Sequence, residues 1–204
     1  MASIYDLKPA FQGLLRPVTR ALAAAGVTAN QVTVAAALLS AAVGAAIALA
    51  PAARWPLLVL PAFLFLRMAL NAIDGMLARE HGQQSRLGAV LNEIGDVLAD
   101  TALYLPLALV PGFAPLPVVL ATILAIVSEM TGVVALQVGS ARRYDGPMGK
   151  SDRAFVFGLA ALLLGLGVPG GTWLAVVLWA VVGLLGLTIV NRARRALAPP
   201  APPA

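Results

Sequence analysis

Long apolar segments constrain this chain more than any other feature, because only a lipid bilayer can solvate so much apolar surface. Of its 204 residues, 60% are hydrophobic and 11% are charged, against about 25% charged in a typical soluble domain. Six segments of roughly 20 residues could each cross the hydrocarbon core. They run from about residue 31 to 50, 55 to 79, 87 to 110, 114 to 139, 153 to 168 and 172 to 190. The sequence therefore predicts an all-α integral membrane protein with six transmembrane helices.

The N-terminal region has a different pattern, in which apolar residues recur every three or four positions. They are Ile4, Leu7, Phe11, Leu14, Val18 and Leu22. This period is typical of an amphipathic helix lying in the membrane interface, although Pro9 and Pro17 are expected to break it. We predict an interfacial helix in residues 1–26, a six-helix membrane domain in residues 27–191, and a disordered cytoplasmic tail in residues 192–204, which ends in Pro and Ala only.

Basic residues predict the orientation of these segments. On one side of the predicted spans lie Lys8, Arg16, Arg20, Arg79, Arg86, Arg142, Arg143, Lys150, Arg153, Arg192, Arg194 and Arg195, and on the other only Arg54. Cytoplasmic loops carry this excess, so both termini are expected on the cytoplasmic side of the cell's inner membrane. Topology thus explains the net charge of +5, and nucleic acid is not an expected partner. Cysteine is absent and histidine occurs once, which excludes disulfides and Cys/His metal clusters.

Polar residues gather where the second and third segments meet across a short loop. Residues three or four apart share a helix face, so Asn71, Asp74 and Ala78 form one face and Gly88, Asn92, Asp96 and Asp100 form another. Antiparallel neighbouring helices would bring these faces together. Acidic groups inside a bilayer are costly and indicate function. Glu80 is expected only to end its helix in the headgroup layer. Glu129 could face the same cavity, but an interhelical hydrogen bond explains it equally well.

Oxygen ligands of this kind favour Mg²⁺ or Mn²⁺, as one or two ions. Such an ion would neutralise a diphosphate, and Arg79 could bind a phosphate oxygen. Gly75 and Gly88 remove side chains beside the carboxylates, which fits close helix packing and ligand access equally.

These residues carry a resemblance to a known family. Asp74-Gly75, Ala78-Arg79, Gly88, Asn92 and Asp96 follow the spacing of the signature of the CDP-alcohol phosphatidyltransferase family. Residues 30–33 also resemble the family's entry motif, with Ala29 in place of its proline. The resemblance implies a homodimeric membrane enzyme of phospholipid biosynthesis. It would move a phosphatidyl group from CDP-diacylglycerol, or a similar CDP-lipid, to an acceptor alcohol and release CMP.

The resemblance also implies roles for single residues. Asp74 and Asp96 would be metal ligands, and Asp96 would also be the catalytic base. The CDP group would lie against Asp74 and the residues Gly75, Ala78, Arg79, Gly88, Asn30 and Thr33. The family's first and third aspartates are replaced here by Asn71 and Asn92, which can ligate a metal but carry no charge. We expect Asp100 to join the metal site and Glu93 to contribute from its rim; alternatively, one ion binds tightly and a second arrives with the nucleotide.

A second polar segment, residues 142–153, separates the fourth and fifth spans. Lys150, Ser151 and Arg153 lie near the start of a helix, where backbone N–H groups favour anions, and Arg142 precedes them. This pattern indicates an acceptor or phosphate subsite, and its basic residues favour a phosphorylated polyol. The alternative is a loop that is charged only for topology.

Three classes of function remain open on this sequence. The first is the metal-dependent transferase. The second is a family member that binds CDP-lipid or phospholipid without standard two-metal transfer, motivated by Asn71 and Asn92. The third is a transporter that uses Asp96, Asp100 and Glu129, which the absence of an internal repeat disfavours. An intramembrane aspartyl protease is disfavoured because its Gly-x-Gly-Asp pattern is missing.

Overall fold

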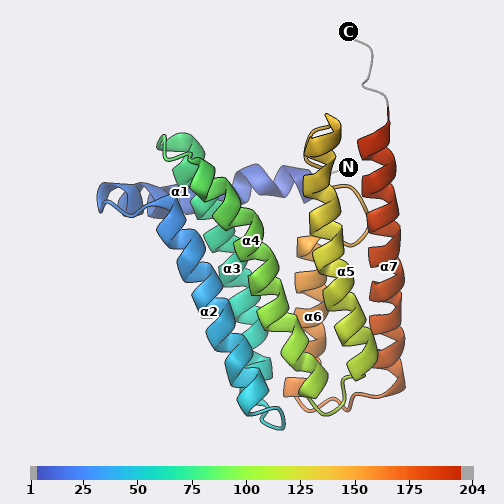
Figure 1. The fold of residues 1–204 in the computed structure, drawn as a ribbon. Helices are drawn as coiled ribbons and strands as arrows, with labels where there is room; N and C mark the ends of the chain where they lie inside the picture. Colours follow the sequence, from blue (N-terminus) through green and yellow to red (C-terminus); the bar gives the residue numbers. More distant parts are fainter. Residues whose placement is uncertain (1–3, 199–204) are drawn as a thin grey trace.

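The computed structural model describes residues 4–198, and within them it contains helices and turns but no strand. The helices are α1 (Ile4–Ala24), α2 (Ala29–Leu49), α3 (Trp55–Glu80), α4 (Arg86–Tyr104), α5 (Pro115–Val134), α6 (Lys150–Gly165) and α7 (Thr172–Leu197), with short 3₁₀ turns η1 (Leu105–Leu109) and η2 (Ala135–Val138). Helices α2 to α7 form a bundle, and α1 lies across it near the end where α3 joins α4 (Figure 1).

Four helical segments of the described chain are long and apolar enough to cross a membrane: Ala29–Leu49, Trp55–Glu80, Pro115–Val138 and Thr172–Leu197. The prediction of an all-helical, multi-pass membrane protein is therefore confirmed. Helix α6 has only 16 residues, and α4 carries Glu93, Asp96 and Asp100 on 19 residues. These two helices belong to the same bundle but are shorter or more polar than the other four.

Local sequence explains where the helices on either side of the site begin. Thr28 accepts a hydrogen bond from the backbone of Gln31, whose side chain bonds back to the Thr28 backbone, and this capping box starts α2. Ser85 caps α4 by accepting from the backbone N–H of Gly88. Both caps lie at the end of the bundle that carries the polar motif.

Helix α1 packs against α3. Phe11 contacts Phe65 edge to face, with ring centroids 5.9 Å apart, and the Arg16 guanidinium donates to both carboxylate oxygens of Glu80. The expectation that prolines would break this helix is wrong, because α1 is continuous from Ile4 to Ala24. Packing on α3 outweighs the lost hydrogen bonds, since tertiary contacts routinely override local propensity.

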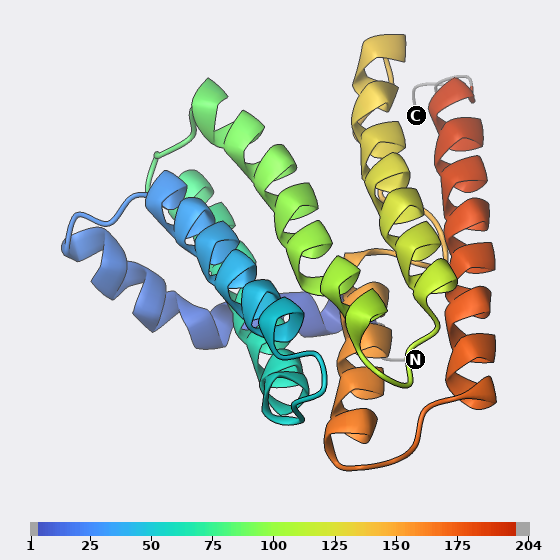
Figure 2. The same ribbon diagram turned by 60° about the horizontal axis from the view of Figure 1, so that its bottom comes forward.

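The bundle has two parts that meet in its middle. Helix α2 packs on α3 and α4, and α5 packs on α7 (Figure 2). Contacts of α3 with α6 and of α4 with α5 join the two parts. Tyr104 stacks on Phe157 there, with ring centroids 4.5 Å apart. Gly44 lets α2 approach α4 closely, because a Cβ at this position would collide with the backbone of Ala102.

The loop of residues 139–149 positions the start of α6. The backbone N–H of Arg143 donates to the carbonyl of Gly132 on α5, at 3.1 Å. The backbone N–H of Met148 donates to the Thr188 hydroxyl on α7, at 3.0 Å. Lys150 therefore starts α6 from a loop that is hydrogen-bonded to two other helices.

The predicted tail needs a correction. Helix α7 continues to Leu197, so residues 192–197 are helical rather than disordered. Arg192 stabilises this last part, since its buried guanidinium donates to the carbonyls of Ser128 and Asp145. Residues 199–204 of the predicted tail lie outside the described residues.

Candidate active site

Asp74 lies on α3 with one carboxylate oxygen free. Asp74 is buried, with 4% of its surface exposed. Oδ2 accepts a hydrogen bond from the Thr33 hydroxyl of α2 at 2.8 Å, whereas the buried Oδ1 has no hydrogen-bond partner among the described residues. A buried unpaired carboxylate oxygen is expensive, so this atom is a candidate ligand for a cation.

Asp96 on α4 lies opposite Asn71 on α3, as the shared faces of the two helices predict. The Asn71 side-chain amide donates to Asp96 Oδ1 at 2.8 Å. The Lys150 ammonium group donates to Asp96 Oδ2 at 2.5 Å, and the Arg67 guanidinium lies 3.3 Å from Oδ1. Asp96 is therefore surrounded by donors from α3 and α6.

Asp100 lies one turn further along α4 and pairs with two guanidinium groups. Its Oδ1 pairs with Arg67 at 2.5 Å and its Oδ2 with Arg153 at 2.8 Å. All three residues are buried. Both oxygens of Asp100 already neutralise guanidinium groups, which disfavours the predicted role of Asp100 as a metal ligand.

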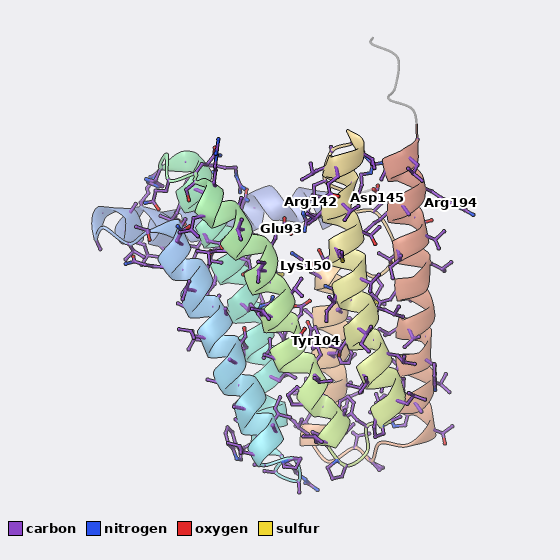
Figure 3. The ribbon with its side chains drawn as sticks, in the orientation of Figure 1. Glu93, Tyr104, Arg142, Asp145, Lys150 and Arg194 are labelled. Carbon is purple, nitrogen blue, oxygen red and sulfur yellow. The ribbon has the colours of Figure 1, made fainter. Side chains whose placement is uncertain are left out.

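Glu129 on α5 is the centre of a group of cations. Its carboxylate lies within 4 Å of Arg142 (3.2 Å), Lys150 (3.7 Å), Arg153 (3.2 Å) and Arg192 (3.5 Å). We call these four side chains the cation group. Glu93 on α4 also pairs with Arg142, at 2.6 Å. Glu93, Arg142 and Lys150 lie between α4 and α5 at one end of the bundle (Figure 3). Lys150 and Arg153 also pair with Asp96 and Asp100, which Arg67 contacts as well, so five cations meet four carboxylates in the connected network. The region therefore has one positive charge in excess, which favours an added anion.

Arg142 is the loop member of this group. Burial alone would lower its pKa, but the hydrogen bond and charge of Glu93 outweigh burial and raise the pKa above its ordinary value. Its guanidinium also lies over the Tyr144 ring, 4.2 Å from the centroid. Arg142 therefore stays charged and is held in place by contacts on two sides.

The residues predicted to contact CDP lie around Asp74. A Cβ on Gly75 would come within 3.0 Å of the Arg79 guanidinium, and a Cβ on Gly88 within 2.7 Å of the Asn30 side-chain oxygen. The glycines thus leave room for Arg79 and Asn30, which lie next to them. Ala78 is partly buried on the same helix as Gly75. The structure brings this predicted set together at the ends of α2, α3 and α4.

The predicted acceptor residues separate into two groups. Lys150 is partly exposed and Ser151 is exposed, so both are accessible at the start of α6. Arg153 has a fully buried side chain, held between Asp100 and Glu129. Arg153 therefore holds Asp100 and Glu129 in position and is not accessible to a substrate.

The number and charge of the oxygen ligands determine how well these residues can bind a metal ion. The free Oδ1 of Asp74 can ligate one Mg²⁺ or Mn²⁺, which prefer oxygen ligands, and Asn71 lies one turn before Asp74 on α3. A pair of ions held by four carboxylates does not fit, since Asn71 and Asn92 are uncharged and Asp96 already has cationic partners. In residues 4–198 there is no group of three or more Asp, Glu, His or Cys side chains that could hold an ion.

The sequence analysis did not predict the role of Arg67 in the site, nor the structural role of Arg192. Arg67 is a lone charge in the middle of an apolar span, and such a residue needs a buried partner; that signal could have paired it with Asp96 and Asp100. Arg192 was interpreted only as a topology signal. Its burial depends on packing between α5 and α7, for which the sequence contains no signal.

The multi-pass helical fold and the polar residues at one end of the bundle define an integral membrane protein with a charged, largely buried site. The CDP-alcohol phosphatidyltransferase family matches residues 26–190, and the chain belongs to this family. It is therefore an enzyme of phospholipid synthesis that transfers a phosphatidyl group from a CDP-lipid. Divalent-metal dependence is expected for the family.

Similar proteins span nearly the whole chain. Inner membrane protein YnbA of Escherichia coli K12 is 46% identical over 196 residues, covering 96% of both chains. Phosphatidylinositol phosphate synthase of Corynebacterium glutamicum is 30% identical over 200 residues, covering 94% of this chain and 87% of that protein.

Solved structures share the fold. Mycobacterium tuberculosis phosphatidylinositol phosphate synthase (PgsA1) with CDP-DAG bound has a TM-score of 0.76 at 21% identity, covering 90% of this chain and 94% of that one. The same synthase in complex with manganese and citrate also has a TM-score of 0.76, at 22% identity, covering 90% and 89%.

Proposed function

We propose that this enzyme transfers the phosphatidyl group of CDP-diacylglycerol to an anionic acceptor alcohol and releases CMP. One observation carries the proposal: Asp96 lies between two different sites. On one side are Asn71 and the open oxygen of Asp74, and on the other is the cation group around Glu129. A carboxylate between a donor site and an anion site can take the proton of a reacting hydroxyl.

The donor side fits a nucleotide diphosphate. Gly75 and Gly88 leave space beside Arg79 and Asn30, and an arginine binds phosphate oxygens well. A Mg²⁺ or Mn²⁺ ion held by Asp74 would neutralise diphosphate charge. The CDP-DAG complex of PgsA1, a protein of the same fold, supports this donor.

The reaction can be followed atom by atom. The acceptor hydroxyl oxygen forms a bond to the phosphatidyl phosphorus, and Asp96 takes the hydroxyl proton. The bond from that phosphorus to the bridging oxygen of CMP breaks, and CMP leaves with the electron pair. Arg67 and Lys150 hold the Asp96 carboxylate in place, at 3.3 and 2.5 Å.

The acceptor side fits a phosphorylated polyol. Lys150 and Ser151 are accessible at the N-terminal end of α6, where the helix dipole favours anions, and Arg142 lies next to Lys150 across Glu129. The Corynebacterium relative is named as a phosphatidylinositol phosphate synthase, whose product carries a phosphorylated headgroup.

We place the active site and both termini on the cytoplasmic side of the inner membrane, with α2 to α7 as six spans and α1 in the interface. Except for the loop with Arg54, the loops that carry basic residues lie at the same end of the bundle as α1 and the C-terminal end of α7 (Figure 1). YnbA, the E. coli relative, is named as an inner membrane protein. A homodimer, as implied by the family resemblance, completes the proposal.

The acceptor is tested with purified enzyme, CDP-diacylglycerol and Mn²⁺, by measuring CMP release with paired polyols that differ only by a phosphate. We expect the phosphorylated partner to be preferred at least tenfold in kcat/KM. Arg142→Met should raise the KM for the phosphorylated polyol and leave the unphosphorylated one unchanged. Equal rates for both polyols would contradict the anionic acceptor.

A second candidate function is CDP-lipid binding without transfer, which the uncharged Asn71 and Asn92 favour. It predicts saturable binding of CDP-diacylglycerol with no CMP release across the whole acceptor panel. Binding together with acceptor-dependent CMP release would exclude it.

A further inference from the structure

We propose that this chain binds a single divalent cation, at Asp74, and that the ammonium group of Lys150 takes the place of a second one on Asp96. The inference rests on the proposed function for its relevance to transfer. Its test counts bound ions and does not measure transfer.

Both carboxylate oxygens of Asp96 already accept from donors, and two of these donors are cations. Oδ1 accepts from the Asn71 amide at 2.8 Å and lies 3.3 Å from the Arg67 guanidinium. Oδ2 accepts from Lys150 Nζ at 2.5 Å. An ion approaching this carboxylate would displace a charged donor and meet another cation within the same radius.

Asn71 contributes to this arrangement through its orientation. Its NH₂ group, rather than its carbonyl oxygen, faces Asp96. A single lone pair of a carboxylate oxygen serves either an N–H donor or a metal ion, so the Asn71 amide occupies one position where an ion could bind. An aspartate at this position would instead repel Asp96 unless a cation lay between them, so the asparagine and the lysine are mutually consistent.

The position of Lys150 is fixed by the surrounding structure. It is the first residue of α6, and the preceding loop is hydrogen-bonded to α5 and α7. Glu129 lies 3.7 Å from the ammonium group on its other side. The ammonium group is thus held between two carboxylates from α4 and α5, in the way that an ion bridges acidic ligands.

Asp74 differs from Asp96 in each of these respects. Its only hydrogen-bonding side chain within the described residues is the neutral Thr33, and Oδ1 is buried without a partner. Asp74 therefore has one open oxygen for an ion, and its hydrogen-bonding side chain within the described residues is neutral.

The experiment counts Mn²⁺ on purified protein in detergent, by equilibrium dialysis with metal analysis, first with Mn²⁺ alone and then with added CDP. The wild-type chain should bind one ion per chain in both cases, and Asp74→Asn should bind none tightly. Lys150→Met should bind Mn²⁺ at least about tenfold more tightly, because one positive charge has left the site. A triple variant with Asn71→Asp, Asn92→Asp and Lys150→Met should bind two ions.

Electron paramagnetic resonance gives a second readout. Ions about 4 Å apart are magnetically coupled, so the triple variant should show a coupled pair and the wild type an isolated Mn²⁺ signal. Arg194→Met is the matched control, since Arg194 is exposed and points away from the site (Figure 3). This variant removes the same charge and should bind Mn²⁺ as the wild type does.

Two ions on the wild-type chain, with or without CDP, would overturn the proposal. So would an absence of Mn²⁺ binding, or a Lys150→Met variant with wild-type affinity and stoichiometry. If the triple variant does not fold, the wild-type count and the single variants still decide the matter. One ion without any CMP release would leave this inference standing and contradict the proposed function.

Discussion

Glu129 is the residue on which the buried ion pairs most depend. It is 3% exposed and lies within 4 Å of four cations from α6, α7 and the loop before α6. Removing one member of a buried ion network leaves the other charges uncompensated. The single carboxylate therefore has more influence than any of its partners.

Replacing Glu129 by Gln should lower the free energy of unfolding by about 3–5 kcal/mol. The measurement is thermal or denaturant unfolding in detergent. Glu93→Gln is the matched control, because Glu93 is one-third exposed and pairs with Arg142 alone; it should change stability by less than about 1 kcal/mol. Equal effects of the two substitutions would contradict the central position of Glu129.

Some single-residue contacts follow from the sequence and others do not. The meeting of Asn71 with Asp96 follows from helix periodicity and a short loop, and the structure confirms it. The contact of Lys150 with Asp96 joins residues 54 positions apart, and periodicity within one helix contains no information about such a pair. The partners of Asp100, Arg67 and Arg153, come from two other helices, so periodicity within α4 does not predict these pairs either.

At the scale of elements, the loop between α5 and α6 sets the position of Lys150. Gly146 has a φ of +123°, and a Cβ there would lie 2.6 Å from the Thr188 side chain. Only glycine adopts this conformation readily, so the loop can follow α7 closely. The acceptor side of the site thus depends on a backbone turn as well as on charges.

Gly146→Ala should destabilise the protein by about 1–3 kcal/mol through backbone strain, and it should also lower CMP release by displacing Lys150. Unfolding and transfer assays on the same preparation measure both effects. Gly186→Ala is the control: Gly186 lies within α7 and a Cβ there would meet nothing within 4 Å, so alanine should be neutral or slightly stabilising. Wild-type stability and activity in Gly146→Ala would refute this role.

Helices were more predictable than their ends. Apolar runs and Pro or capping residues indicated the segments, and the structure has helices at each of them. The sequence did not reveal that α7 would reach Leu197 or that α1 would continue through its prolines. Both extensions depend on packing, of Arg192 against Ser128 and of α1 against α3, and neither contact has a local signal.

At the scale of the whole molecule, the charge distribution predicts the orientation in the membrane. The chain contains no cysteine, so single cysteines can report the side of each loop. Ser85→Cys and Ser140→Cys should react with an impermeant maleimide only from the cytoplasmic side, and Ala53→Cys only from the opposite side. The assay compares intact cells with inverted vesicles, and reaction of all three from the same side would contradict six spans.

The most direct test of the transfer reaction is CMP release from CDP-diacylglycerol by the purified enzyme with a phosphorylated polyol and Mn²⁺, compared with Asp96→Asn. The wild type should release CMP only when the acceptor is present, and loss of the proton acceptor should lower the rate at least about 100-fold while CDP-diacylglycerol still binds. Glu80→Gln, an exposed carboxylate at the end of α3, should keep the wild-type rate. Undiminished CMP release in Asp96→Asn would contradict the account.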